Sequence, residues 1–268
     1  MSSVKKLDVA AQEKNRVENG TLYLVATPIG NLADLSERAI KVLSEVDFIA
    51  AEDTRVTLKL LNHLGIKKSL VSYYEHNKAQ KGNVILERIL AGETCALVSD
   101  AGSPAISDPG EDLVDLCAER GITITSIPGC CAGITALTLS GLPTRRFTFE
   151  GFLSVNKAER KKHLDSLKNE PRTMIFHEAP HKLLRTLEDM LECWGDRRIA
   201  LCREITKLHE ECRRTTLSQA VAHYTENPPR GEFVLVIRGA AVEKGPRIPL
   251  EEAMAVVARY RAEGKSLK

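Results

Sequence analysis

Residues His177 to His181 read HEAPH and match the H-E-x-x-H pattern of zinc proteases, in which two histidines bind the metal and the glutamate, here Glu178, acts as the base. Both histidines must lie on one face of an α-helix to reach a single zinc ion. Pro180 lies inside the motif and disfavours helical geometry at the residue before it. The apolar run at 173–176 predicts a buried strand that leads into the motif. Since no third ligand follows at a recognisable spacing either, we predict that HEAPH joins a strand to a helix beginning at about Pro180, and that the chain has no metal site.

A second group of reactive side chains, Glu52, Asp53 and Arg55, follows the apolar run at 48–51. Carboxylates at the end of a strand could do acid–base chemistry. They could equally pair with the arginine as a structural scaffold. Both readings are open from the sequence.

The segment 99–110 (SDAGSPAISDPG) has the most unusual composition, with two Gly, two Pro and two Asp within twelve residues. Gly allows the backbone to approach a ligand closely, and Pro makes a loop rigid. Such a loop suits an adenosine-like ligand held by backbone groups, although it could also be purely structural. The chain lacks G-x-G-x-x-G after its first apolar run and lacks G-x-x-x-x-G-K-[ST], so neither NAD nor a phosphate-binding P-loop is predicted.

These groups must be positioned by the elements before them, and in the first half short apolar runs alternate with amphipathic ones. This rhythm predicts an α/β domain with a mainly parallel sheet covered by helices on both faces. Ligands bind outside the carboxyl ends of parallel strands, so the loops at 27–32, 52–55, 99–110 and 128–133 should share one edge. We predict strands at 21–26, 47–53, 69–75, 94–100 and 123–129, and helices at about 34–46, 54–64, 82–90 and 110–120.

The second half resembles another α/β domain with a less regular order. We predict strands at 147–153, 173–178, 198–205, 211–217 and 232–239, and helices near 157–168, 180–193, 217–226 and 250–262. The predicted organisation is a flexible lead-in at 1–20, an N-terminal α/β domain at 21–142, a C-terminal α/β domain at 143–240, and a linker with the start of a truncated helical tail at 241–268.

Composition narrows the class of protein. The 43% hydrophobic and 28% charged residues are ordinary for a soluble globular chain, and no apolar run approaches the roughly 20 residues that span a bilayer. Seven cysteines form no C-x-x-C pair, which favours free thiols in a reducing cytoplasm, although Cys130–Cys131 could be a vicinal redox pair.

Charge is distributed unevenly along the chain. Residues 1–142 carry 14 Lys and Arg against 18 Asp and Glu, a net charge of −4, whereas residues 143–268 carry 24 against 18, a net charge of +6. A basic second half could bind a polyanion, or its clusters could be solvated helix faces. Aromatic residues make up only 4% of the chain, so a base-stacking platform is not predicted.

Eight ordered motifs resemble those of the ribosomal RNA small subunit methyltransferase I family, part of the tetrapyrrole-methylase-like superfamily. They cover the chain from about Thr21 to Gly239 and read ATPIGNLADLSERA, AEDTRVTLKLL, VSDAGSPAISDPGEDLV, IPGCCAGITAL, FEGFL, FHEAPHKLL, REITK and RGEFVLVI. The resemblance implies two α/β domains with S-adenosylmethionine in the cleft between them, a homodimer, and methylation of the 2′-hydroxyl of a cytidine in the decoding region of 16S rRNA in the 30S subunit. It also implies a cytoplasmic protein that needs no metal.

The resemblance also assigns residues. It implies that the methyl donor contacts Pro28, Gly102, Ser103, Ile106, Ala132 and His177. Family members commonly have Tyr where this chain has His177, so the role of that side chain is open.

A ribose hydroxyl is a poor nucleophile, and a carboxylate at the cleft would help to remove its proton. We expect Glu52 and Asp53 to be the catalytic candidates, with Glu178 behind them. The alternatives are a small-molecule methyltransferase that acts on a tetrapyrrole, and a non-catalytic RNA-binding protein.

Overall fold

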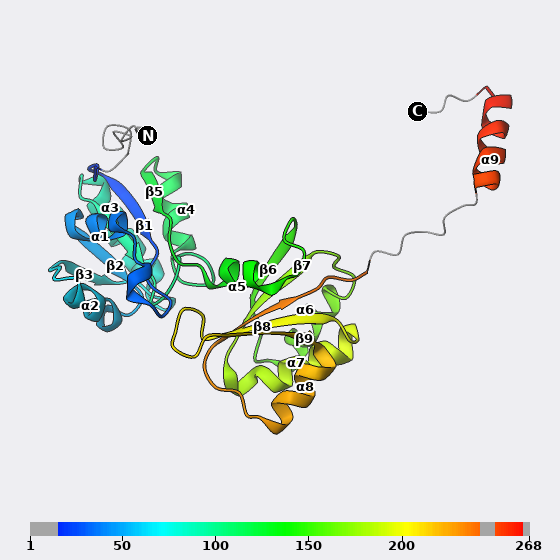
Figure 1. Cartoon of the computed structure of the whole chain (residues 1–268). Helices are drawn as coiled ribbons and strands as arrows, with labels where there is room; N and C mark the ends of the chain where they lie inside the picture. Colours follow the sequence, from blue (N-terminus) through cyan, green and yellow to red (C-terminus); the bar gives the residue numbers. More distant parts are fainter. Residues whose placement is uncertain (1–15, 242–249, 265–268) are drawn as a thin grey trace, which may run out of the picture.

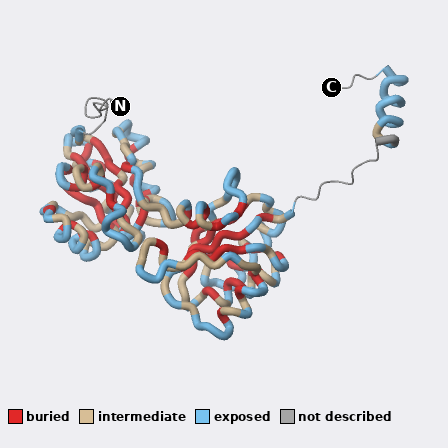
Figure 2. Tube along the Cα trace, in the orientation of Figure 1, coloured by how far each residue is buried: buried red, intermediate tan, exposed pale blue. Residues whose placement is uncertain are grey.

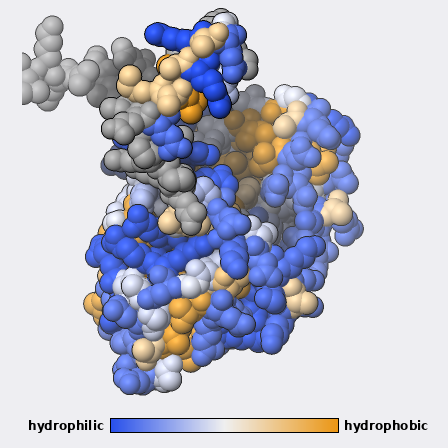
Figure 3. Space-filling view, turned by 90° about the vertical axis from the view of Figure 1, so that its right-hand side faces the viewer, coloured by the Kyte–Doolittle hydropathy of each residue, from blue (hydrophilic) through white to orange (hydrophobic). Residues whose placement is uncertain are grey.

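The computed structural model describes residues 16–241 and 250–264, which form two α/β domains and a further helix, α9 (Leu250–Ala262) (Figure 1). Most of the predicted lead-in and of the linker at 241–247 lies outside the described residues. Buried residues follow the strands of both sheets (Figure 2). Hydrophilic residues cover most of the face in Figure 3, with smaller hydrophobic patches between them.

The first sheet is parallel throughout, as the alternating pattern predicts, and its strand order is β3-β2-β4-β1-β5. Its central strands are buried on both faces, which explains their nearly continuous apolar sequences. The strands are β1 (Thr21–Val25), β2 (Phe48–Ala51), β3 (Ser69–Ser72), β4 (Cys95–Val98) and β5 (Thr123–Ile127).

Helices cover this sheet on both faces. One core cluster joins α1 and α2 to Val25, Ile49 and Val98, and another joins α3 and α4 to the alternate residues of the same strands. The helices are α1 (Glu37–Glu45), α2 (Thr54–His63), α3 (Lys78–Leu90) and α4 (Glu111–Glu119), and a 3-10 turn, η2, spans Leu32–Asp34.

The second sheet is mixed, with strand order β6-β7-β10-β8-β9 and one parallel pair, β6 with β7. Helices α6, α7 and α8 pack on one face through a core that includes Phe176, Leu187 and Trp194. The elements are β6 (Phe147–Phe152), α6 (Lys157–Ser166), β7 (Thr173–Glu178), α7 (Pro180–Trp194), β8 (Arg198–Arg203), β9 (Glu211–Thr216), α8 (Leu217–Glu226) and β10 (Phe233–Ile237).

Helix α5 (Ala132–Ser140) follows the first sheet in sequence but packs on the second. Its residues Ala136 and Leu137 contact the cluster around Ile175 and Val236, on the face opposite α7. The sequence prediction has no helix here, because AGITALTLS is apolar on nearly every side and lacks the amphipathic period that reveals a helix. Since α5 crosses from one sheet to the other, it fixes where the two domains meet.

Candidate active site

A cavity of about 530 Å³ lies between the two domains. The first domain contributes the loops after β1, β2 and β4, and α5 contributes its first turn. The second domain contributes the ends of β6, β7, β8 and β10. Both domains are therefore needed to form it.

On the first domain the cavity lies at the switch point of the sheet. Strands β1 and β4 are neighbours, but β1 connects to β2 on one side and β4 connects to β5 on the other. In parallel α/β sheets, this reversal opens a crevice at the carboxyl ends of the two strands. The predicted edge of four loops thus coincides with the expected place for a ligand.

Hydrogen bonds hold these loops to one another. The N–H of Thr27 donates to the carbonyl of Gly102 at 2.9 Å, and the N–H of Gly102 donates back to Thr27 at 3.0 Å. The hydroxyl of Ser103 donates to the carbonyl of Cys130 at 3.0 Å, which ties the loop after β4 to the loop after β5. The segment 99–110 is therefore pre-organised by its neighbours rather than by internal contacts alone.

Backbone strain is concentrated around the cavity. Among the described residues, the four non-glycine residues with positive φ are Ala105, Ser107, Glu204 and Thr206. They lie in the loop after β4 and in the loop after β8, on opposite domains, and Ser107 and Glu204 line the cavity. Such conformations cost about 1–3 kcal/mol each and cluster at functional sites.

Three carboxylates line the first-domain side of the cavity: Glu52, Asp100 and Asp108. Burial raises the pKa of Glu52 above its ordinary value of 4.5, and the negative charges of Asp108 and Asp100 raise it further. Burial likewise raises the pKa of Asp108. Glu52 therefore has the character of a carboxylate that accepts a proton more readily than an exposed one.

Asp53 has a different environment from its neighbour and does not line the cavity. Its carboxylate caps α2 by accepting from the N–H of Arg55 at 2.8 Å, and the guanidinium of Arg55 donates to it at 2.6 Å and 3.0 Å. The hydrogen bonds from Arg55 lower the pKa of Asp53 to about 2. This geometry favours the scaffold reading for Asp53.

Glu178 lines the cavity from the end of β7 and is buried. Its carboxylate accepts from the hydroxyl of Thr186 at 2.6 Å and from the N–H of Ala179 at 2.9 Å. Thr186 lies on α7, so these bonds fasten the end of the strand to the helix that follows.

His177 lines the cavity beside two phenylalanines. Its ring lies edge to face with those of Phe149 and Phe152, with centroid distances of 5.4 Å and 5.3 Å. Its Nε2 atom is buried without a hydrogen-bond partner, and burial lowers the pKa of His177 below its ordinary value of 6.5. The ring is thus neutral at pH 7.

The loop after β8 brings a cation into the cavity. The ammonium of Lys207 donates to Glu204 at 3.0 Å and to Glu232 at 2.8 Å. A Cβ built on Gly30 would overlap the Lys207 side chain, so this loop of the second domain touches the loop after β1. The absence of a side chain at Gly30 allows that approach.

The HEAPH segment has the geometry predicted for it. His177 lies in β7, whereas His181 lies in α7, which begins at Pro180. The two histidines do not share a helix face, so the zinc-protease arrangement is not formed. Across the described ranges, no cluster of three or more His, Cys, Asp or Glu is arranged to hold a metal ion. Within the same ranges, no helix is long and apolar enough to cross a bilayer.

The structure brings together most of the residues expected in the site. Two are not among the lining residues, Asp53 and Pro28, although Ile29 beside Pro28 is. The residues that line the same cavity are Glu52, Gly102, Ser103, Ile106, Ala132, His177 and Glu178.

Sequence reasoning missed Asp100, Asp108, Lys207, Phe149 and Phe152 as site residues. A local pattern could have pointed to the two phenylalanines, because a glycine inside an apolar strand (FEGF) indicates a bulge or a close backbone approach. Asp100, Asp108 and Lys207 lie in loops that follow predicted strands, but nothing in their sequence shows which side chains turn inward.

Comparison with known proteins gives a consistent family. Residues 21–221 match the model of the tetrapyrrole (corrin/porphyrin) methylases. The ribosomal RNA small subunit methyltransferase I of Synechocystis sp. is 50% identical over 91% of this chain and 88% of its own length, and that of Halalkalibacterium halodurans is 50% identical over 89% and 81%. A solved structure of uroporphyrin-III C-methyl transferase from Thermus thermophilus, complexed with S-adenyl homocysteine, shares the fold with a TM-score of 0.55 at 18% identity, over 81% of this chain and 96% of that one.

Proposed function

This chain belongs to the tetrapyrrole (corrin/porphyrin) methylase family, together with its ribosomal RNA small subunit methyltransferase I relatives, and on this premise we propose that it methylates small-subunit rRNA with S-adenosylmethionine as the donor. One observation carries the proposal: the similarity to the rRNA methyltransferases extends over both domains that form the cavity. The finer assignment, the 2′-hydroxyl of a cytidine in the decoding region of 16S rRNA, rests on the resemblance of the motifs.

The cavity suits the donor. Its volume of about 530 Å³ is within the range of small-molecule sites. Small residues at Gly102 and Ala132 expose backbone groups, and the carboxylate of Asp100 can accept hydrogen bonds from the donor's amino group or ribose hydroxyls. We propose that Gly102, Ser103, Ile106, Ala132 and His177 bind the donor, with Pro28 shaping the loop beside them. S-adenosylmethionine supplies an electrophilic methyl group.

We assign the general base to Glu52. Its carboxylate takes the proton of the acceptor hydroxyl, and its raised pKa favours that transfer. Asp53 supports this step from outside the cavity by fixing the start of α2. Glu178, which is held by Thr186 and Ala179, is a second carboxylate within the same cavity.

The proposed substrate implies a cytoplasmic protein whose partner is the 30S subunit, and the resemblance implies a homodimer. Light scattering of the purified chain would test the dimer: a mass near 59 kDa, twice the 29.6 kDa of one chain, is expected.

The decisive assay measures transfer of a labelled methyl group to 30S subunits isolated without this modification. We expect transfer to a single 2′-oxygen of 16S rRNA and none to a panel of tetrapyrroles. Transfer to a tetrapyrrole alone would assign the alternative function, and failure to bind S-adenosylmethionine in calorimetry would leave an RNA-binding protein without activity.

The same assay tests the base. Glu52→Gln should reduce kcat by about 10²- to 10⁴-fold, which is the usual contribution of a general base. The matched control is Glu87→Gln, an exposed carboxylate on α3 outside the cavity, which should leave kcat unchanged. Full activity of Glu52→Gln would remove Glu52 from the mechanism.

A further inference from the structure

The edge strand β6 contains a β-bulge at the cavity. Phe149 pairs with Ile175 of β7, but the next pair along the strands is Gly151 with Phe176, so Glu150 is an extra residue. Gly151 has φ of +62°, and a Cβ built on it would lie 2.9 Å from the hydroxyl oxygen of Ser107 in the first domain. A glycine is therefore required both by the turn of the bulge and by the approach of the other domain.

The bulge re-aims the side chain of Phe152. In a regular strand, residues three apart point to opposite faces of the sheet. Because of the extra residue, Phe149 and Phe152 pair with Ile175 and His177, which are two apart in β7 and share a face. Both phenylalanines thus lie on the cavity face with the His177 ring between them, and we call Phe149 and Phe152 the β6 aromatic wall.

The wall remains open to solvent in an otherwise aromatic-poor protein. Phe152 is 57% exposed and Phe149 is 38% exposed. Exposed aromatic surface at the mouth of a cavity is apolar area that a ligand could cover, at about 25 cal/mol per Å².

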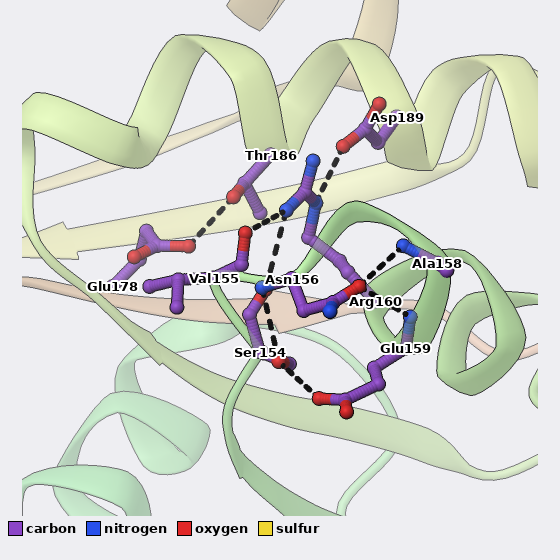
Figure 4. Close-up of polar contacts among 9 residues, drawn as sticks. All are labelled: Ser154, Val155, Asn156, Ala158, Glu159, Arg160, Glu178, Thr186 and Asp189. Carbon is purple, nitrogen blue, oxygen red and sulfur yellow. Dashed lines mark hydrogen bonds and ion pairs between the residues drawn. The ribbon is translucent and has the colours of Figure 1, made fainter.

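The wall is also rigid on its outer side. The guanidinium of Arg160, which is buried, donates to the carbonyls of Ser154 and Val155 at 3.2 Å and 3.3 Å, just after Phe152 (Figure 4). Its Nε donates to Asp189 of α7 at 2.7 Å, which joins this loop to the body of the domain (Figure 4). The chain that directly follows Phe152 is therefore anchored to the domain.

The loop after Phe152 leads into a helix with exposed lysines. Helix α6 begins five residues after Phe152 and carries Lys157, Lys161 and Lys162 on exposed positions. Because α6 packs on the face of the sheet opposite α5, the feature at the cavity that suits an unstacked base is the pair of exposed aromatic rings.

We propose that the β6 aromatic wall binds the unstacked nucleobase of the acceptor nucleotide, or of its immediate neighbour. This inference rests on the proposed function and adds a subsite to it. A ribose inside a folded RNA reaches a cavity between two domains when its base leaves the stack, and aromatic side chains replace the lost stacking. Four of the proposed donor residues, Gly102, Ser103, Ile106 and Ala132, come from the first-domain loops and α5. The fifth, His177, lies between the two phenylalanines, which leaves the exposed ring of Phe152 for the acceptor.

The test compares steady-state kinetics on under-modified 30S subunits with the donor Kd from calorimetry. Phe152→Ala should raise KM for the subunit roughly 5- to 150-fold, the loss expected from one base–aromatic stack, with the donor Kd unchanged. Phe152→Tyr should restore KM, and Phe152→Leu, which keeps an apolar side chain without a ring, should not. The matched control is Phe147→Ala, since Phe147 is a 37% exposed residue of the same strand outside the cavity.

Each result has a distinct meaning. A wild-type chain that methylates no 30S subunits would refute the proposed function itself. An active wild type with an unchanged KM in Phe152→Ala, or a full rescue by Phe152→Leu, would refute the base subsite alone. A donor Kd that rises in parallel with KM would assign the wall to the donor and overturn the inference.

A fluorescence measurement tests stacking on Phe152 without catalytic turnover. A short RNA carrying 2-aminopurine at the acceptor position should lose fluorescence on binding to the wild type and to Phe152→Tyr, but not to Phe152→Ala. Equal quenching by all three chains would contradict stacking on Phe152.

Discussion

Replacing Arg160 with alanine should destabilise the second domain by about 3–5 kcal/mol, the usual effect of removing one partner from a buried ion pair. The side chain of Arg160 is 5% exposed and that of Asp189 is 27% exposed. Water can therefore solvate the remaining carboxylate in part, which moves the expected value toward the lower limit. Two carbonyls, those of Ser154 and Val155, lose their donor as well, which adds about 1 kcal/mol each where water does not replace it.

The single tryptophan makes this prediction measurable in the domain concerned. Trp194 is buried in the second-domain core, where its Nε1 donates to the carbonyl of Leu164 at 2.9 Å. Urea unfolding followed by tryptophan fluorescence therefore reports the second domain separately from the first. The urea concentration at the midpoint should fall by about 1–5 M, since a loss of about 3–5 kcal/mol is divided by an m of about 1–3 kcal/mol per M.

Two further variants distinguish the loss of the Arg160 hydrogen bonds from the general effect of a substitution in α6. Lys161→Ala removes a neighbouring exposed side chain, 68% exposed, and should change the free energy of unfolding by less than about 0.5 kcal/mol. Arg160→Lys keeps the charge but lacks the planar guanidinium that reaches Asp189 through Nε and the two carbonyls through Nη1, so an intermediate loss is expected. If Arg160→Ala were as mild as Lys161→Ala, the buried network would not be what anchors the loop after β6.

Further predictions concern the cavity. In the wild type, kcat/KM should fall as pH is lowered through the pKa of Glu52, which lies above 4.5, because the base must be ionised; Glu52→Gln should lose this dependence. Burial lowers the pKa of His177, so the unfolded state binds a proton below pH 6.5 more readily than the folded state does. The free energy of unfolding of the wild type should therefore fall relative to that of His177→Tyr as pH drops below 6.5. The donor Kd of the two chains should be equal from pH 6.5 to 8, and a difference in calorimetry would give His177 a charge-dependent role. Gly30→Ala should displace Lys207 and reduce kcat/KM by about 10- to 100-fold, while the melting temperature of the second domain stays unchanged. Unchanged kinetics would show that catalysis does not need the close contact between the loop after β1 and the loop after β8. Gly151→Ala, at φ of +62°, should cost about 1–2 kcal/mol in unfolding free energy, measured by urea titration, and a neutral result would mean that the bulge tolerates a side chain.

Much of the architecture was predictable from local patterns. The parallel first sheet follows from the alternation of apolar and amphipathic runs, and the bend at Pro180 follows from the backbone limits of proline. Strand β7 and helix α8 have the predicted bounds. The missed helix is α5, whose pattern is set by burial against another domain rather than by an interface with water.

The candidate site was predictable only in outline. The sequence placed Glu52 and Asp53 together, but their environments differ because Asp53 caps α2 and binds Arg55 while Glu52 is turned into the cavity. Adjacent residues of one turn cannot be separated in this way without coordinates. The contact between Gly30 and Lys207 joins residues 177 positions apart, so no local pattern could reveal it.

By itself, the sequence determined the two α/β halves, the edge at which their loops converge, the family and the absence of the helix that a zinc-binding HEAPH would need. Those features depend on periodicity, on turn residues and on ordered motifs, all of which are local. The tertiary structure alone decided which carboxylate is buried, how the domains share one cavity, and that a single extra residue at Glu150 turns Phe152 toward His177. These depend on strand register and on contacts between distant segments, and a shift of one residue in register exchanges the faces of a sheet.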